Sequence, residues 1–108
     1  MEKLQILETN TPENLFSEKR FYSLCLLNDN TTPVNFVVEM LKFCMYYTDE
    51  DAEKVVRYTE KKGKCEVKRF TDESLALFCK EQCEKYVNNK NLTYSFPQEF
   101  KMEIERTV

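Results

Sequence analysis

Hydrophobic residues fall into short segments separated by polar turns, and this pattern predicts alternating strands and helices along most of the chain. Residues 20–27, RFYSLCLL, form a compact aromatic and aliphatic run that ends at the polar sequence NDNTTP, as a strand followed by a turn does. Residues 65–68 and 100–106 alternate apolar and polar positions, which is typical of half-buried strands. The pattern therefore predicts three strands.

Two helices are predicted between the first and second strands. Thr32-Pro33 resembles an N-cap followed by proline at the first helical position, so a helix is expected over residues 34–45. That helix is apolar on nearly every side, which indicates burial on two faces or the lining of a pocket. Thr48 and three acidic residues begin the next helix, and Gly63 suits the left-handed position after its end.

A third helix is predicted after the second strand, with Thr71 as its N-cap and Asn88-Asn89 at its end. Its expected inner face consists of Leu75, Cys79, Cys83 and Tyr86.

The order of elements predicts a small α+β sandwich, in which three helices cover a three-stranded antiparallel sheet. Residues 1–18 show no sustained period, so we expect a flexible N-terminal arm with apolar residues for docking to a partner. Residues 19–108 then form one domain, a size that suits a chain of 108 residues.

Composition excludes many functions. The chain has no His and a single Gly, so His-based catalysis, His metal sites and glycine-rich phosphate loops are excluded. A net charge of −3 argues against nucleic-acid binding, and no apolar run reaches the length of a membrane span. These absences leave few classes of enzyme open, and we expect no catalytic residues and no metal site.

The cysteines allow two interpretations. Cys79 and Cys83 lie one helical turn apart and are potential ligands for a soft metal, but their place on an apolar stripe favours core packing. Cys25 and Cys65 lie in predicted strands with no His to activate a thiolate, so a thiol enzyme has little support. Five cysteines, an odd number with no CxxC pair, suggest reduced thiols.

The turn at residues 28–33 is the strongest candidate for chemistry. Asn28, Asp29 and Asn30 place amide and carboxylate oxygens beside an apolar helix, and the second helix brings Glu60 close to them. Such oxygens accept the three N–H donors of an ammonium group. The alternative is that NDNTTP serves only as a turn and helix cap.

These residues also resemble a known family. The stretch LCLLNDNTTPVNFVVEML is similar to the signature of ClpS, the adaptor of bacterial and plastid AAA+ Clp proteases, and the spacing continues to Gly63-Lys64 and to Phe70-Thr71-x-Glu73. The resemblance covers about residues 19–90. It implies an adaptor without a cofactor that captures substrates by a bulky hydrophobic N-terminal residue and delivers them to a Clp unfoldase.

The resemblance also assigns roles to individual residues. The substrate N-terminus would be bound by Asn28, Asp29, Asn30, Thr32 and Glu60, and the first side chain by a pocket of Val34, Val37, Val56 and Thr59. Glu73 would lie in the surface that docks on the N-terminal domain of the unfoldase. A monomer in the bacterial cytoplasm or an organellar stroma is expected.

Three differences from the family pattern affect the predicted site. The family's second Asp is Asn30, its amine-binding His is Glu60, and its two gate methionines are Val34 and Val56. We expect Glu60 to replace the His as an amine ligand, and the valines to leave a wider gate. The alternative is a ClpS-like regulator or scaffold that docks on the unfoldase but no longer recognises free N-termini.

Overall fold

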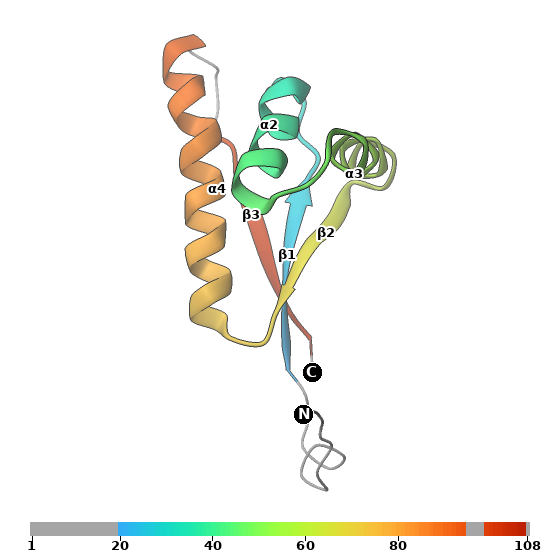
Figure 1. Cartoon of the computed structure of the whole chain (residues 1–108), viewed down its shortest axis with the longest axis vertical. Helices are drawn as coiled ribbons and strands as arrows, with labels where there is room; N and C mark the ends of the chain where they lie inside the picture. The colour runs from blue at the N-terminus through green and yellow to red at the C-terminus, as the bar shows by residue number, and fades with distance from the viewer. Residues whose placement is uncertain (1–19, 95–98, 108) are drawn as a thin grey trace, which may run out of the picture.

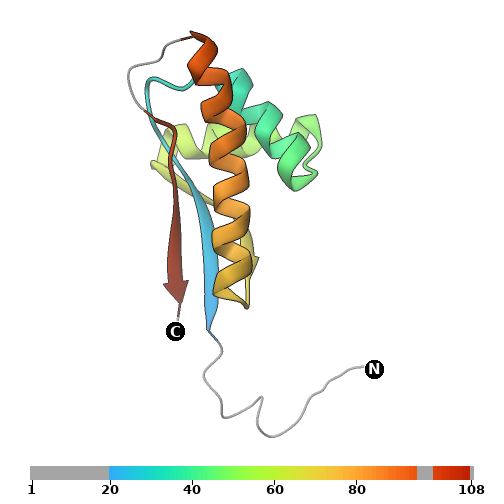
Figure 2. The same cartoon turned by 90° about the vertical axis from the view of Figure 1, so that its left-hand side faces the viewer.

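Three helices lie against a three-stranded sheet in a computed structural model that describes residues 20–94 and 99–107 (Figures 1 and 2). The elements in chain order are β1 (Phe21–Leu27), α2 (Val34–Met45), α3 (Asp49–Lys62), β2 (Lys64–Phe70), α4 (Glu73–Tyr94) and β3 (Met102–Thr107). The α+β prediction is confirmed. The predicted arm, residues 1–18, lies outside the described residues.

The sheet has the order β2-β1-β3, and both pairings are antiparallel. The central strand β1 contributes the buried pair Leu24 and Leu26. Its register with β2 shifts between Leu24 and Cys25, so one extra residue is accommodated there. The last residues of β1 therefore lie beside the first residues of β2, where α3 ends (Figure 1).

The observed ends of α2 and α3 agree only in part with the capping residues predicted from the sequence. Thr48 caps α3, accepting the Asp51 backbone N–H at 3.1 Å. The N-cap of α2 is Pro33 rather than Thr32, and it makes no side-chain capping bond. Thr32 lies one residue before the cap, and its hydroxyl instead donates to Asp29 at 2.9 Å.

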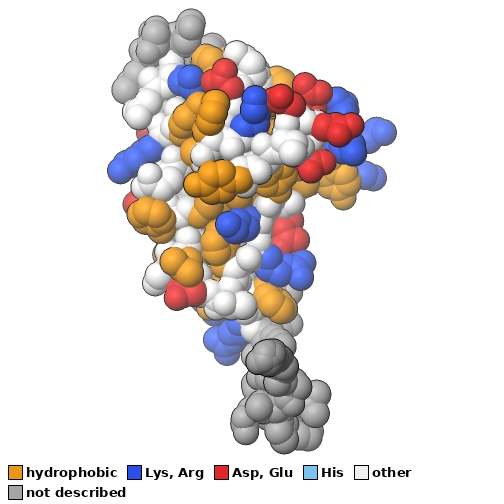
Figure 3. All heavy atoms as spheres, viewed as in Figure 1, with side chains coloured by type: hydrophobic (Ala, Val, Ile, Leu, Met, Phe, Trp, Pro, Cys, Tyr) orange, Lys and Arg blue, Asp and Glu red, His pale blue; other side chains and the backbone are white. Residues whose placement is uncertain are grey.

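Helix α4 differs from the prediction in three ways. It begins at Glu73 after Asp72, whose carboxylate accepts the Ser74 N–H at 2.8 Å, and it continues past Asn88-Asn89 to Tyr94. Its buried residues are Ala76, Cys83 and Val87, whereas Leu75 is 58% exposed. Figure 3 shows hydrophobic side chains on the surface over this helix.

The core lies between the helices and the sheet. Its largest fully buried side chains are Phe100, Leu24, Met40, Leu41, Val87 and Cys83. Asn88 of α4 fixes Phe100, since its side chain accepts the Phe100 N–H at 2.8 Å and donates to the Phe100 carbonyl at 3.0 Å. Phe100 therefore packs in the core although it precedes β3.

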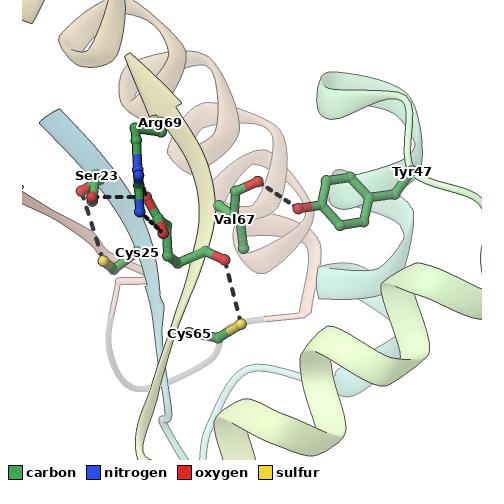
Figure 4. Close-up of polar contacts among 7 residues, drawn as sticks. Ser23, Cys25, Tyr47, Cys65, Val67 and Arg69 are labelled. Atoms are coloured by element: carbon green, nitrogen blue, oxygen red, sulfur yellow. Dashed lines mark hydrogen bonds and ion pairs between the residues drawn. The ribbon is translucent and has the colours of Figure 1, made fainter. Parts of the chain in front are cut away.

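Polar contacts hold β2 in place on both of its sides (Figure 4). Ser23 donates to Glu66 at 2.8 Å, and Arg69 donates to the same carboxylate at 2.9 Å. On the helix side, the Tyr47 hydroxyl donates to the carbonyl of Val67. This last contact ties the α2–α3 connection to the sheet.

No helix in the described part of the chain is long and apolar enough to cross a membrane.

Candidate functional site

A hollow opens where β1 ends, α2 begins and α3 ends. It encloses about 330 Å³, including the part open to solvent. Its lining consists of Leu26, Leu27, Asn28, Asp29, Thr32, Val34, Val37, Val56, Thr59, Glu60 and Phe100. Eight of the nine residues predicted for substrate binding lie in this set; the ninth is Asn30.

Asp29 organises the turn at one side of the hollow. One of its carboxylate oxygens accepts the backbone N–H groups of Thr31 at 2.8 Å and Thr32 at 2.7 Å, and each threonine hydroxyl also donates to the carboxylate. Burial alone would raise the pKa of Asp29, but the four hydrogen bonds outweigh it and lower the pKa. The carboxylate is therefore ionised, and both of its oxygens take part in holding the turn.

A main-chain contact joins the two sides of the mouth. The Asn28 N–H donates to the carbonyl of Gly63 at 3.0 Å, immediately after α3 ends. Gly63 has the left-handed φ of 91°, which directs the chain from α3 into β2. The strand end that carries Asn28 is thereby fixed against the helix end that carries Glu60.

Asn28 and Glu60 are the polar groups at the mouth that remain available to a ligand. In the described part of the chain, neither side chain makes a hydrogen bond or an ion pair, and both are exposed. Asn28 offers an amide oxygen and Glu60 a carboxylate, both acceptors for N–H donors. A cationic group at the mouth would meet the negative charge of Glu60 with little desolvation cost to the free protein.

The floor of the hollow is apolar. Val37, Val56 and Thr59 are buried, and the Thr59 hydroxyl is satisfied by donating to the Val55 carbonyl at 2.8 Å. Val34 is 49% exposed at the rim. An apolar side chain is therefore the group that suits the interior.

The hollow is narrow in this structure. Its free volume is about 40 Å³, whereas a cavity of about 150 Å³ accommodates benzene. The sequence predicted a wider gate from the two valines. A phenyl ring would enter fully only if side chains such as Val34 move outward.

Three lining residues were not assigned to the site from the sequence. Leu26 and Leu27 directly precede the turn, so their place at the end of β1 was a usable signal. Phe100 is distant in sequence and reaches the hollow through its contacts with Asn88, for which the local pattern holds no signal.

Two predicted residues lie away from the hollow. Asn30 is exposed on the turn and does not line it. Glu73 is exposed at the start of α4, at the opposite end of the domain (Figure 1). The site therefore contains one turn residue fewer than predicted.

The cysteines are all free thiols within the fold. Burial, followed by nearby carboxylates, raises the pKa of Cys25 to about 11. Burial also raises the pKa of Cys44, Cys65 and Cys83. Among residues 20–94 and 99–107, no group of three potential ligands is arranged to hold a metal ion.

The chain is similar to known proteins both in sequence and in structure. The family profile described as "ATP-dependent Clp protease adaptor protein ClpS" matches residues 17–95. The solved structure of Agrobacterium tumefaciens ClpS2 bound to L-phenylalaninamide is similar, with a TM-score of 0.60 and 25% identity. The similarity covers 82% of this chain and 100% of that one. No curated protein matches the chain in sequence.

Proposed function

The chain belongs to the ClpS family of Clp protease adaptor proteins, and from that premise we propose that its hollow binds the N-terminal residue of substrate proteins. The α-ammonium group lies between Asn28 and Glu60, and the first side chain enters the apolar interior. Bulky hydrophobic first residues are the substrates. The observation that carries this proposal is the pair of unpartnered acceptors above an apolar floor.

The chemistry matches a free chain terminus better than an internal residue. An ammonium group supplies three N–H donors and a positive charge, and the mouth supplies an amide oxygen and the carboxylate of Glu60. The solved relative holds a phenylalanine with a free amine and an amidated carboxyl group, which is the same ligand chemistry.

Delivery is the second part of the proposal. The adaptor docks on the N-terminal domain of a Clp AAA+ unfoldase through a surface that includes Glu73. It acts as a monomer, without catalysis of its own, in the bacterial cytoplasm or an organellar stroma. Helix α4 begins at Glu73, and its start lies at the end of the domain away from the last residues of β1, so substrate and unfoldase can be held at once (Figure 1).

One alternative has a specific observation in its favour. The free volume of the hollow is about 40 Å³, and Glu60 stands where the family has His. A ClpS-like regulator that docks on the unfoldase without recognising N-termini would need no larger pocket.

A titration separates the two functions. Peptides beginning with Phe, Leu or Arg, and an acetylated Phe peptide, are titrated into the 108-residue protein by calorimetry. Binding of the free Phe and Leu peptides, and not of the acetylated peptide, supports N-terminal recognition. Failure of every peptide to bind overturns it in favour of the regulator.

A further inference from the structure

A second opening continues from the hollow. It is a groove between α2 and α3 with a free volume of about 580 Å³, against about 40 Å³ for the hollow. Typical ligand sites have volumes of about 300–1,000 Å³. The lining of the groove consists of Val34, Asn35, Val38, Glu39, Lys42, Glu53, Val56, Arg57 and Glu60. Val34, Val56 and Glu60 line both openings, so the groove begins at the mouth of the hollow.

The dimensions of the groove suit an extended peptide. Its α2 side runs from Val34 to Lys42, which at 1.5 Å per residue is about 12 Å. An extended chain advances about 3.3 Å per residue, so three to four residues span that length. A substrate held by its first residue in the hollow has its next residues at the start of the groove.

The charges along the groove differ in how strongly they are already paired. Lys42 lies 2.6 Å from Asp49, and Glu39 lies 3.1 Å from Lys90. Arg57 and Glu53 form a longer ion pair, with 3.9 Å between their charged atoms, and the Arg57 side chain is 66% exposed. Such a contact contributes little, so Arg57 is available to another partner.

We propose that residues two to four of the substrate lie extended in this groove, and that Arg57 favours an acidic residue at position three. The inference rests on the proposed function of the hollow. Arg57 precedes Glu60 by three residues, about 4.5 Å along α3, which places it one to two substrate residues beyond the ammonium group. Val34, Val38 and Val56 provide apolar contact for the substrate backbone and small side chains.

Ligand length provides the first test. Phenylalaninamide fills only the hollow, whereas Phe-Ala-Glu-Ala-amide also reaches the groove, so the tetrapeptide is expected to bind at least threefold more tightly. Equal affinities overturn the groove proposal and leave the proposed function intact. If neither ligand binds, the proposed function itself fails.

Charge reversal provides the second test, with a matched control on the same helix. Arg57→Glu is expected to weaken binding of Phe-Ala-Glu-Ala-amide by about two- to fivefold at low salt, the scale of an exposed ion pair, and to strengthen binding of Phe-Ala-Lys-Ala-amide. Lys54→Glu makes the same change in net charge at an exposed position outside the groove, so it is expected to leave both affinities unchanged. Equal effects of the two variants, or no effect of Arg57→Glu, contradict a contact at Arg57.

Discussion

Two carboxylates at the mouth of the hollow have different tasks. The Asp29 carboxylate accepts four hydrogen bonds from Thr31 and Thr32, whereas Glu60 makes no hydrogen bond or ion pair with the described residues. The sequence predicted both as ligands of an ammonium group. In the fold, Asp29 is engaged in the turn, whereas the Glu60 carboxylate is left without a partner among the described residues, and we propose that it supplies the charge for the ligand.

Glu60→Ala tests that assignment. We expect it to weaken binding of phenylalaninamide by about tenfold, the scale of one lost charge-assisted contact. Glu50→Ala removes the same charge from the first turn of α3, away from the hollow, and serves as the control. Calorimetric affinities that are equal for both variants would show that Glu60 does not contact the amine.

Asp29→Asn tests the structural role of the other carboxylate. Its lowered pKa means that its hydrogen bonds stabilise the fold above the unfolded-chain pKa of about 3.9, and that this contribution is lost as pH falls through the lower folded-state pKa. The substitution is expected to reduce the free energy of unfolding by about 1–2 kcal/mol at pH 7.

Urea denaturation at a series of pH values measures this effect. The difference between wild type and Asp29→Asn is expected to shrink at low pH. Asp51→Asn, at an exposed carboxylate without a hydrogen bond or ion pair in the described chain, is the control. A pH-independent difference would mean that the charge of Asp29 is not involved.

At the scale of elements, α2 and α3 both end in a residue with the left-handed backbone conformation, but the two residues differ in type. Tyr46 follows α2 with φ 62° although it has a β-carbon, and Gly63 follows α3 with φ 91°. The Tyr46 side chain is 88% exposed, so packing does not explain its presence. A β-carbon at Gly63 would contact nothing within 4 Å, so only backbone conformation constrains that position.

Substitutions at the two helix ends should therefore change the free energy of unfolding in opposite directions. Tyr46→Gly is expected to raise the free energy of unfolding by about 0.5–1 kcal/mol, and Gly63→Ala to lower it by about 1 kcal/mol. Urea denaturation measures both changes, as shifts of the unfolding midpoint at an unchanged m-value. Tyr46→Ala keeps the β-carbon and controls for loss of the rest of the side chain. If Tyr46→Ala stabilises the protein as much as Tyr46→Gly does, backbone strain is excluded as the cause.

The sequence predicted the elements better than the faces they bury. Capping signals such as Thr48 and Gly63 are local, and α3 has the ends they predict. Leu75 was placed inside because it continues an apolar stripe, but α4 buries Ala76 instead, since helix rotation is set by contacts with α2 and the sheet. Residues that adjoin the turn, such as Asn28 and Asp29, line the hollow, and the sequence placed them together because they are neighbours in the chain; Phe100 was missed because only tertiary packing brings it there.

At the scale of the whole molecule, the two proposed contact regions are separated by most of the domain. The 22 residues of α4 span about 33 Å, and Glu73 lies at the end away from the hollow (Figures 1 and 2). Leu75, Leu77 and Phe78 expose apolar surface close to Glu73 in the sequence. Such a patch favours contact with another protein.

Separation of the regions predicts separable defects. Glu73→Lys is expected to weaken binding to a Clp unfoldase N-terminal domain by tenfold or more, with the affinity for phenylalaninamide unchanged. Glu50→Lys makes the same change in the first turn of α3 and should affect neither. Pull-down with the isolated N-terminal domain and calorimetry with the amide report the two activities, and their joint loss would contradict independent regions.

The bond between the Asn28 N–H and the Gly63 carbonyl has a consequence for how this protein changes over time. Because it joins only main-chain atoms, exchanging a side chain such as that of Val34 or Glu60 leaves this bond in place. We therefore expect single substitutions at such positions to change which groups the hollow accepts, with no refolding of the scaffold. The same property makes this frame a practical starting point for engineered hollows with other linings.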